Sequence, residues 1–339
     1  MVPMTPKMLV QYLREQIPTL DPIFIEGPPG CGKTSIVRQA AATLGYECPY
    51  FPPAITLDPV DLRGVPHVEG NGHGKITNWA IPAFLNFPPD WKGIFFIDEL
   101  AQGTTAIQAS FGQMTYGGRL GDWVKPAQSM FIAASNRQSD RAGAHRTISL
   151  LENRFKWVEL INSIEDWQEW ARAAGICSEI RTYLNSDSKC LNTFDPKSAD
   201  HTCATQRSWE LADRAFKAAS DPMKHTAVAS CVGSAVATSF TAFWHVYAHL
   251  PDLDAVLKHP DKVDVPSRHD VLWATCGSLA ERLANYKAST AEAILTFAER
   301  LPREFNLFLV RDAMAVSGRK MASAKGMDAW IAKNKDVLL

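Results

Sequence analysis

The sequence predicts an α/β fold, in which a parallel sheet is sandwiched by helices, followed by an all-helical part. Three short apolar runs, at residues 23–25, 94–97 and 130–134, have the length and composition of buried strands. The first run leads through a glycine-rich turn into a helical pattern, as expected for an open α/β sheet. Beyond residue 161, apolar residues recur at helical spacing.

The chain starts with signals for a helix and then for the first strand. Thr5 is a suitable N-cap, and Pro6 is a suitable first helical residue. The apolar face of this helix comprises Met8, Leu9, Tyr12 and Leu13. Residues 23–25 then form a strand, and residues 35–44, which lack proline and glycine, form the next helix.

The turn between that strand and that helix, residues 27–34, satisfies the phosphate-loop pattern G-x-x-x-x-G-K-[ST]. Its glycines allow turns that a Cβ would forbid, and its N–H groups form an anion site with the positive end of the helix. Lys33 is expected to reach the β- and γ-phosphates, and the Thr34 hydroxyl to bind Mg²⁺. The predicted nucleotide contacts are Gly27, Pro28, Pro29, Gly30, Cys31, Gly32, Lys33, Thr34 and Ser35.

The second αβ unit carries an insertion. Residues 50–57 have an extended pattern, and residue 57 begins a helical turn that ends at Gly64. Residues 65–79 are rich in glycine and histidine, which predicts a loop or a hairpin.

Two carboxylates follow the strand at residues 93–97. Asp98 and Glu99 lie at its C-terminal end, where ligands collect in an open α/β sheet. In that position Asp98 would hold Mg²⁺, and Glu99 would polarise the attacking water as a general base. The alternative is an acidic strand end that caps the next helix.

The third strand, residues 130–134, is also followed by polar residues. Before it, Ile107, Phe111 and Met114 share one helical face, and residues 116–125 predict a hairpin. After it, Asn136 lies at the strand tip, where it would orient the lytic water. A turn-forming asparagine is the alternative interpretation.

The rest of the chain is expected to contain one more strand, at 157–161, and then helices. These helices begin at residues 163 and 206, span 226–245, run from 267 to about 286, and span 290–300 and 303–316. The segment 226–245 is uncharged but rich in Ala, Ser and Thr, so we expect a buried helix and not a membrane span.

Composition narrows the class of protein. A chain of 339 residues with 46% hydrophobic residues is long enough for two domains with a core. Its net charge of −1 argues against dependence on contacts with a nucleic-acid backbone. Seven scattered cysteines without CxxC pairs, and no secretory signal, favour a reducing cytoplasm and no membrane partner.

Six segments in this order resemble an AAA+ ATPase of the helix-2-insert clade. They are the phosphate loop, the insertion, I-F-F-I-D-E-L at 94–100, A-A-S-N-R at 133–137, L-L-E-N-R-F at 150–155 and Q-R-S-W-E at 206–210. Within that clade the chain is similar to the MoxR-like branch found in bacterial and phage genomes. The resemblance is strong over about residues 20–215 and looser beyond.

The resemblance implies roles for further residues. Asn136 matches sensor 1, Arg154 the arginine finger that acts on ATP of the neighbouring subunit, and Arg207 the lid residue sensor 2. The alternatives are a structural cation at Arg154 and a salt bridge at the start of a helix for Arg207. Arg141 and Arg146 compete with Arg154 for the finger role. The implied catalytic residues are Glu99, Asn136, Arg154 and Arg207.

The resemblance also implies domains, cofactors and partners. It divides the chain into a nucleotide-binding domain at 1–162, a helical lid at 163–250 and a helical extension of the lid at 251–339. ATP and Mg²⁺ are the implied cofactors, and the implied assembly is a homo-oligomeric ring, in the family a hexamer. The ring would remodel or chaperone a protein client, beside a partner with a von Willebrand factor A domain.

Two further expectations follow from the clade. Helicases and restriction subunits share it, so a nucleic-acid motor or a restriction-type NTPase is the alternative function. In such rings the insertion and the hairpin at 116–125 lie on one face or at the pore, which makes Trp79, Tyr116 and Trp123 candidate contacts.

Overall fold

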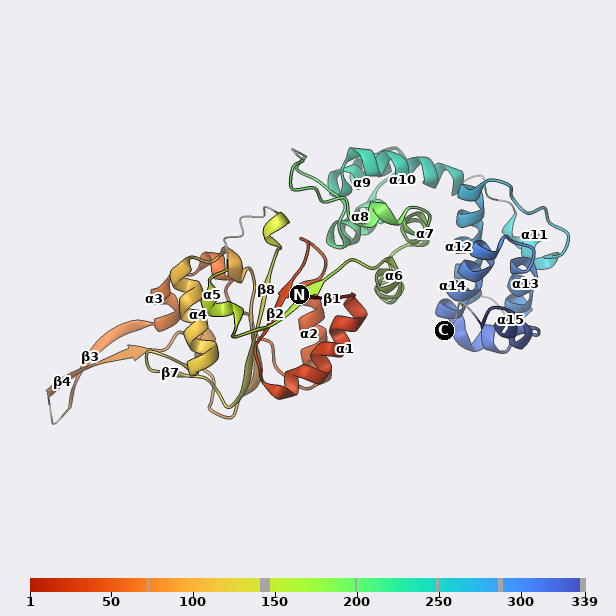
Figure 1. Cartoon of the computed structure of the whole chain (residues 1–339). Coiled ribbons are helices and arrows are strands. Elements are labelled where there is room, and N and C mark those ends of the chain that lie inside the picture. The colour runs from red at the N-terminus through yellow and green to blue at the C-terminus, as the bar shows by residue number, and fades with distance from the viewer. Residues whose placement is uncertain are drawn as a thin grey trace. The chain divides into compact units, whose positions relative to one another are not determined.

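A five-stranded parallel sheet forms the centre of the first of two structural units (Figure 1). The computed structural model describes residues 1–71, 74–140, 147–198, 200–247, 250, 252–285 and 289–335. The first unit comprises Met1–Ser163 with Phe194–Ala199, and the second comprises Ile164–Thr193 with Asp200–Leu339. The predicted fold class, a parallel sheet between helices followed by an all-helical region, is confirmed.

The strand order of the sheet is β1-β9-β2-β8-β5, and all neighbouring strands are parallel. The strands are β1 (Val2–Met4), β9 (Lys156–Leu160), β2 (Ile23–Glu26), β8 (Gln128–Ser135) and β5 (Lys92–Ile97). Side chains alternate between the two faces, so Ile23 and Ile25 lie in one core and Phe24 lies in the other. Helices cover both faces, which explains why the strands are apolar runs.

Three helices of the first unit form where the sequence predicts them. Helix α1 (Pro6–Gln16) begins at the N-cap Thr5, whose hydroxyl accepts a hydrogen bond from the Met8 N–H. It packs with α2 (Lys33–Thr43) on one face of the sheet. Helix α4 (Thr105–Gly117) covers the other face, and its residues Ile107, Phe111 and Met114 are fully buried there. The other helices of this unit are α3 (Pro59–Arg63) and α5 (Ser149–Glu152).

Residues 50–57 are not a strand. They are irregular up to Pro53 and then form the short 3-10 helix Ala54–Thr56. In this part of the chain, pairing with the sheet is limited to one isolated bridge between Glu47 and Gly93. Two prolines within 50–57 lack the N–H that a ladder requires, which gives the physical reason.

Both expected hairpins are present. Strands β3 (Val65–Asn71) and β4 (Gly74–Ala80) form the insertion and extend away from the sheet (Figure 1). Strands β6 (Arg119–Leu120) and β7 (Trp123–Val124) form the second hairpin. Of the candidate surface aromatics, Tyr116 is exposed, but Trp123 is buried and its indole N–H donates to the Leu85 carbonyl at 2.9 Å. The expectation that Trp123 forms a surface contact was therefore wrong, because its side chain is buried within the single chain.

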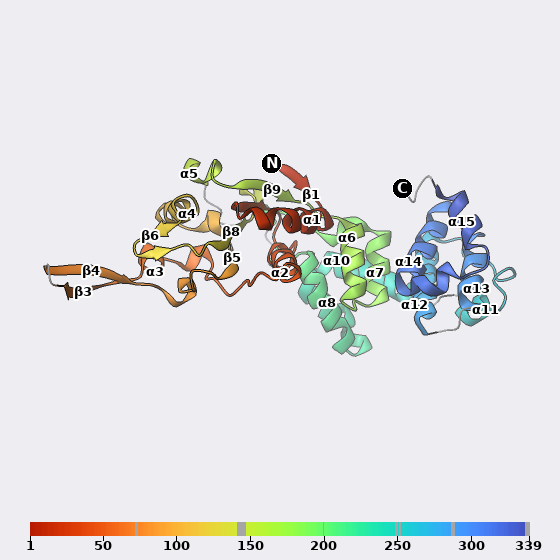
Figure 2. The same cartoon turned by 90° about the horizontal axis from the view of Figure 1, so that it is seen from below.

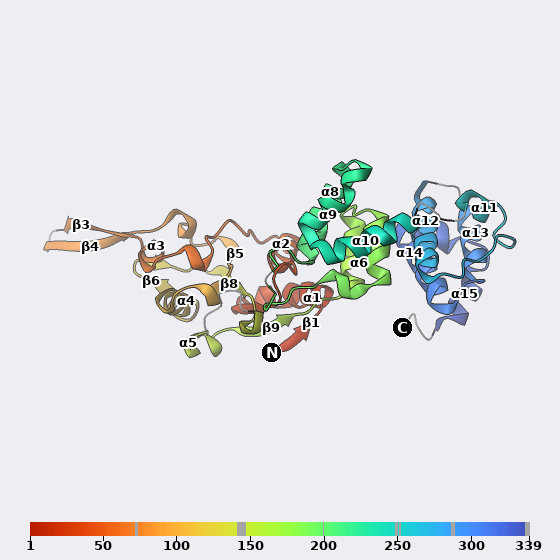
Figure 3. The same ribbon diagram turned by 90° about the horizontal axis from the view of Figure 1, so that it is seen from above.

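The described residues of the second unit form helices and connecting loops, without a strand (Figure 2, Figure 3). Its helices are α6 (Ile164–Ala173), α7 (Ser178–Ser186), α8 (Gln206–Ala218), α9 (Lys224–Val232), α10 (Ser234–Tyr247), α11 (Leu253–Lys258), α12 (His269–Asn285), α13 (Ser289–Ala298), α14 (Arg303–Ala322) and α15 (Met327–Lys333). Helix α14 packs against α12 and α13 (Figure 2).

The expected single helix at 226–245 is interrupted. Gly233 has φ 88° and separates α9 from α10, and a Cβ at this position would lie 3.0 Å from the Thr202 carbonyl oxygen. A left-handed conformation and a close backbone contact both favour glycine here. No helix among the described residues is long and apolar enough to cross a membrane.

Candidate active site

The phosphate loop connects β2 to α2, and its glycines are required by the backbone. Gly30 and Gly32 have φ of 68° and 91°, a region that favours glycine. A Cβ on Gly27 would lie 2.8 Å from the Leu160 carbonyl oxygen of the neighbouring strand β9. Among the described residues, the N–H groups of Gly30 and Gly32 have no hydrogen-bond acceptor. The loop therefore has the open donors that an anion would bind.

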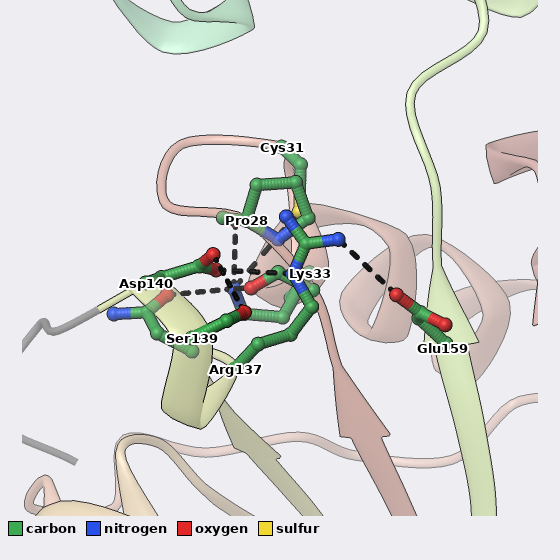
Figure 4. Close-up of polar contacts among 9 residues, drawn as sticks. Pro28, Cys31, Lys33, Arg137, Ser139, Asp140 and Glu159 are labelled. Atoms are coloured by element: carbon green, nitrogen blue, oxygen red, sulfur yellow. Dashed lines mark hydrogen bonds and ion pairs between the residues drawn. The ribbon is translucent and has the colours of Figure 1, made fainter. Parts of the chain in front are cut away.

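Lys33 lies inside this loop. Its ammonium donates to the carbonyl oxygens of Gly27 and Pro28 at 2.9 and 3.0 Å, and to Asn136 Oδ1 at 3.0 Å (Figure 4). The side chain is buried, and burial lowers the pKa of Lys33. An ammonium has three N–H groups, so these three acceptors occupy all of them. A phosphate oxygen that bonds to Lys33 therefore has to replace one of them.

Thr34 and Asp98 come together from α2 and from the end of β5. The Thr34 hydroxyl donates to Asp98 Oδ2 at 3.0 Å, and Asp98 Oδ1 accepts from the Glu99 N–H at 3.0 Å. Hydroxyl and carboxylate oxygens are ligands that Mg²⁺ accepts, and it usually completes its shell with water and substrate phosphates. The described residues contain no group of three or more His, Cys, Asp or Glu that could hold a metal by themselves. This pair fits a magnesium ion carried by a nucleotide.

Glu99 has an unusual backbone conformation. Its φ of 57° and ψ of 37° are left-handed, which is uncommon for a residue other than glycine. Its side chain is half-buried, and among the described residues the carboxylate has no hydrogen-bond or ion-pair partner. Strained conformations of this kind concentrate at functional positions. The sequence carried no signal for this conformation.

Ser135 is a structural link that sequence reasoning missed. Its carbonyl accepts from the Gly27 N–H at 3.3 Å, and its hydroxyl accepts from the Ala101 N–H at 2.8 Å. Ser135 is the last residue of β8 and precedes Asn136. It therefore joins the phosphate loop, the turn after Glu99 and the Asn136 position.

Arg137 was also missed. Its guanidinium contacts Asp140 and Glu159 and lies near Lys33 (Figure 4). A cavity of about 630 Å³ adjoins this cluster, and Glu26, Asn136, Arg137 and Trp157 are among its lining residues.

Arg154 lies in the first unit, on the surface of α4. Its guanidinium donates to the Gly112 carbonyl and lies 4.9 Å from the centre of the Tyr116 ring. Its backbone N–H also donates to the Leu151 carbonyl. Among the described residues Arg154 has no other interaction, so it does not contact the phosphate loop of its own chain. Arg141 and Arg146, the competing finger residues, lie outside the described residues.

Arg207 is the second residue of α8 in the helical unit, and it is exposed. A capping box between Thr205 and Ser208 begins this helix. A cation at a helix N-terminus is electrostatically unfavourable, and the first turn of α8 contains no acidic residue. Its approach to a nucleotide in the other unit stays a prediction.

Two of the predicted nucleotide contacts, Ser35 and Cys31, differ in their exposure to solvent. Ser35 is exposed on the first turn of α2. Cys31 is buried, and burial raises the pKa of its thiol. A buried thiol with a raised pKa is a poor nucleophile, so we do not expect Cys31 to be oxidation-sensitive in this fold.

A family model matches the part of the chain that contains this site. Residues 23–157 match the ATPase family associated with various cellular activities (AAA). The matched segment contains the phosphate loop, the Asp98–Glu99 pair and Asn136. The α/β unit therefore contains an AAA ATPase domain.

The individual proteins that the chain resembles are distant from it in sequence. Over 59 residues the chain is 36% identical to the Holliday junction branch migration complex subunit RuvB of Treponema pallidum, a match that spans 17% of this chain and 17% of that protein. Among solved structures, NtrX from Brucella abortus with ADP has a TM-score of 0.41 at 16% identity, over 98% of this chain and 68% of NtrX. The RuvB Holliday junction branch migration motor of Thermotoga maritima has a TM-score of 0.39 at 16% identity, over 81% of this chain and 79% of the RuvB chain. The fold assignment rests on the sheet and the family match.

Proposed function

We propose that this protein is a Mg-ATP-dependent ring ATPase of the MoxR-like type, which uses ATP hydrolysis to remodel or chaperone a protein partner in the cytoplasm of a bacterium, encoded by the host or by a phage. The observation that carries the proposal is the convergence of three strand ends. Lys33 and Thr34 follow β2, Asp98 and Glu99 follow β5, and Asn136 follows β8.

Each side chain has one proposed task. The N–H groups of the loop and Lys33 bind the phosphates, while Thr34 and Asp98 hold Mg²⁺, which would neutralise charge on the phosphate oxygens. Glu99 takes a proton from the attacking water, since its carboxylate is half-buried and otherwise unpartnered among the described residues. Asn136 orients that water through its amide.

Arg154 is proposed to complete the site of a neighbouring subunit. Its contacts with Gly112 and Tyr116 support this role, because they hold the guanidinium on the surface of α4 at an exposed tyrosine. A guanidinium that reaches the γ-phosphate stabilises the charge of the transition state. Arg207 is proposed to contact the γ-phosphate from the lid of the same subunit.

The ring proposal is tested by mixing two inactive variants. Lys33→Ala cannot bind ATP but keeps its finger, whereas Arg154→Ala binds ATP but lacks the finger. Mixed oligomers contain interfaces with an intact loop and an intact Arg154, so we expect partial recovery of phosphate release. Each variant alone should stay inactive. Size-exclusion chromatography of differently tagged chains verifies that both variants are present in the same oligomer. Confirmed mixed rings without turnover would contradict the trans role.

A nucleic-acid motor is the second candidate function, because the short sequence match is to a branch-migration subunit. The net charge of −1 does not favour it, since non-specific binding to nucleic acid depends on basic surfaces. Phosphate release measured with and without linear DNA and a four-way junction separates the two. We expect an unchanged rate, and stimulation of several-fold would favour the motor.

Purification with the ATP-trapping Glu99→Gln variant then identifies a bound client or a von Willebrand factor A domain partner.

A further inference from the structure

Arg137 connects the turn after β8 to strand β9. Its Nε donates to Asp140 Oδ2 at 3.2 Å, and its Nη1 donates to Glu159 Oε1 at 3.2 Å (Figure 4). Asp140 is nearly inaccessible to solvent, with 6% of its side chain exposed, while the side chain of Glu159 is 26% exposed. Two nitrogens of one planar guanidinium thus bridge two segments that are far apart in sequence.

The turn that Arg137 begins is held at both ends. Its backbone carbonyl accepts from the Asp140 N–H at 2.9 Å, which closes the 3-10 helix Gln138–Asp140. The Ser139 hydroxyl donates to Asp140 Oδ1 at 3.3 Å. Asn136 immediately precedes this turn, and its amide oxygen receives the bond from Lys33. The position of the amide therefore depends on a turn fixed through Arg137.

Three carboxylates surround Arg137, and its positive charge reduces the repulsion between them. Strand β2 lies between β8 and β9, and the register places Glu26 opposite both Ser135 and Glu159. Burial, and then repulsion from Glu159, raise the pKa of Glu26, while Arg137 acts in the opposite direction. Without the guanidinium, Glu26, Asp140 and Glu159 would repel one another next to the phosphate loop.

We propose that Arg137 is a positioning residue, which holds the Asn136 amide at Lys33 by tying the turn after β8 to β9. It acts through Asn136 and does not touch the nucleotide. This inference rests on the proposed function, in which Asn136 orients the water that attacks the γ-phosphate and therefore lies beside that phosphate. Lysine at this position would keep the charge but lose the fork, so it would bind Asp140 or Glu159 but not both in this geometry.

The expected consequence is a selective loss of γ-phosphate recognition. ADP lacks the γ-phosphate beside which Asn136 is proposed to act, so we expect its affinity not to depend on Arg137. The analogue ATPγS carries the third phosphate, so its affinity should fall when the amide loses its position. The loss of one hydrogen bond corresponds to about a threefold to tenfold change in affinity.

The test measures the dissociation constants of ATPγS and ADP by isothermal titration calorimetry with Mg²⁺ present, for the full-length wild-type chain and for Arg137→Gln, Arg137→Lys and Asn136→Ala. Arg14→Gln, at an exposed arginine in the last turn of α1, is the matched control. Glu159→Gln and the double variant Arg137→Gln/Glu159→Gln complete a double-mutant cycle, which measures the coupling between Arg137 and Glu159. The unfolding midpoint of each variant is measured in parallel.

We expect Arg137→Gln to weaken ATPγS about threefold to tenfold with unchanged ADP affinity, as Asn136→Ala does. Arg137→Lys should recover part of this loss, and the double variant should lose no more than Arg137→Gln alone. Wild-type discrimination in Arg137→Gln, or an equal loss for ADP and ATPγS, overturns the inference. If Asn136→Ala is also without effect, the proposed role of Asn136 fails. A wild-type chain that binds neither nucleotide overturns the proposed function itself.

Discussion

Lys33 Nζ lies 3.0 Å from Asn136 Oδ1, although 103 residues separate them in the chain. This bond joins the start of α2 to the tip of β8, and it connects the proposed phosphate-binding cation to the proposed water-orienting amide. The ammonium has no N–H left for a phosphate, so a nucleotide has to displace an acceptor. A nucleotide that displaces Asn136 Oδ1 from Lys33 would couple occupancy of the phosphate loop to the position of Asn136.

The Asn136→Ala variant is expected to bind ATP about threefold to tenfold more weakly and, at saturating ATP, to hydrolyse it at least about tenfold more slowly, because the amide that orients the water is lost. Steady-state phosphate release and ATP affinity, measured on the same preparation, separate the two effects. Asn86→Ala, at an exposed asparagine of the same unit, is the control. Turnover near the wild-type rate in Asn136→Ala would leave a turn-forming role as its only function.

Thr34→Val removes the hydroxyl that contacts Asp98 and keeps the shape of the side chain. We expect its ATPase activity to require about tenfold more Mg²⁺, since one oxygen ligand is lost. A titration of phosphate release with Mg²⁺ measures this. Thr43→Val is the matched control, because that hydroxyl lies on the same helix and bonds to the Ala40 carbonyl. An unchanged Mg²⁺ requirement in Thr34→Val would argue against a metal at this hydroxyl.

Glu26→Gln is expected to raise stability at neutral pH. Burial raises the pKa of Glu26 in the folded chain, so the folded state binds more protons than the unfolded state above the ordinary value of 4.5. Stability therefore falls as the pH rises through this window. Glutamine does not ionise, so the variant avoids that loss. Its free energy of unfolding should exceed that of the wild type most at about pH 8, and the difference should shrink as the pH falls to about 5. Urea unfolding measures it, with Glu152→Gln, at an exposed position, as the control; a constant difference across this range contradicts the prediction.

Asp312→Ala is expected to destabilise the helical unit by about 2 kcal/mol, because Arg172 and Arg181 each lose a buried carboxylate partner, while Arg181 keeps its ion pair with Glu281. Asp312 accepts from Arg172 Nε at 2.8 Å and lies 3.7 Å from Arg181 Nη1, and the side chains of Arg181 and Asp312 are 4% and 5% exposed. The free energy of unfolding from urea denaturation checks this value. Asp261→Ala, at an exposed aspartate of the same unit, should change it little. A similarly small effect at Asp312 would show that the network contributes no stability.

The local parts of the fold and of the site could be predicted because short sequence patterns determine them. The loop at Gly27–Thr34 requires glycine for backbone reasons, and Asp98 must follow an apolar strand, so both are visible in the sequence. The N-cap at Thr5 and the hairpins follow from nearby residues in the same way.

The parts that were missed depend on the register between distant strands. Ser135 joins two turns, and Arg137 bridges Asp140 to Glu159, only because β8, β2 and β9 are neighbours with a specific pairing. The left-handed backbone of Glu99 is likewise set by its surroundings. A break at Gly233 was missed because the helical pattern continues on both sides of it.

Phosphate release by Glu99→Gln, compared with the wild-type chain at saturating Mg-ATP, tests the central claim most directly. The glutamine keeps the size of the side chain but cannot accept the proton of the attacking water. We predict ATP affinity close to that of the wild type and a turnover reduced about a hundredfold or more. Wild-type turnover in this variant, with ATP bound at the same site, would contradict the assignment of Glu99 and with it the proposed hydrolytic centre.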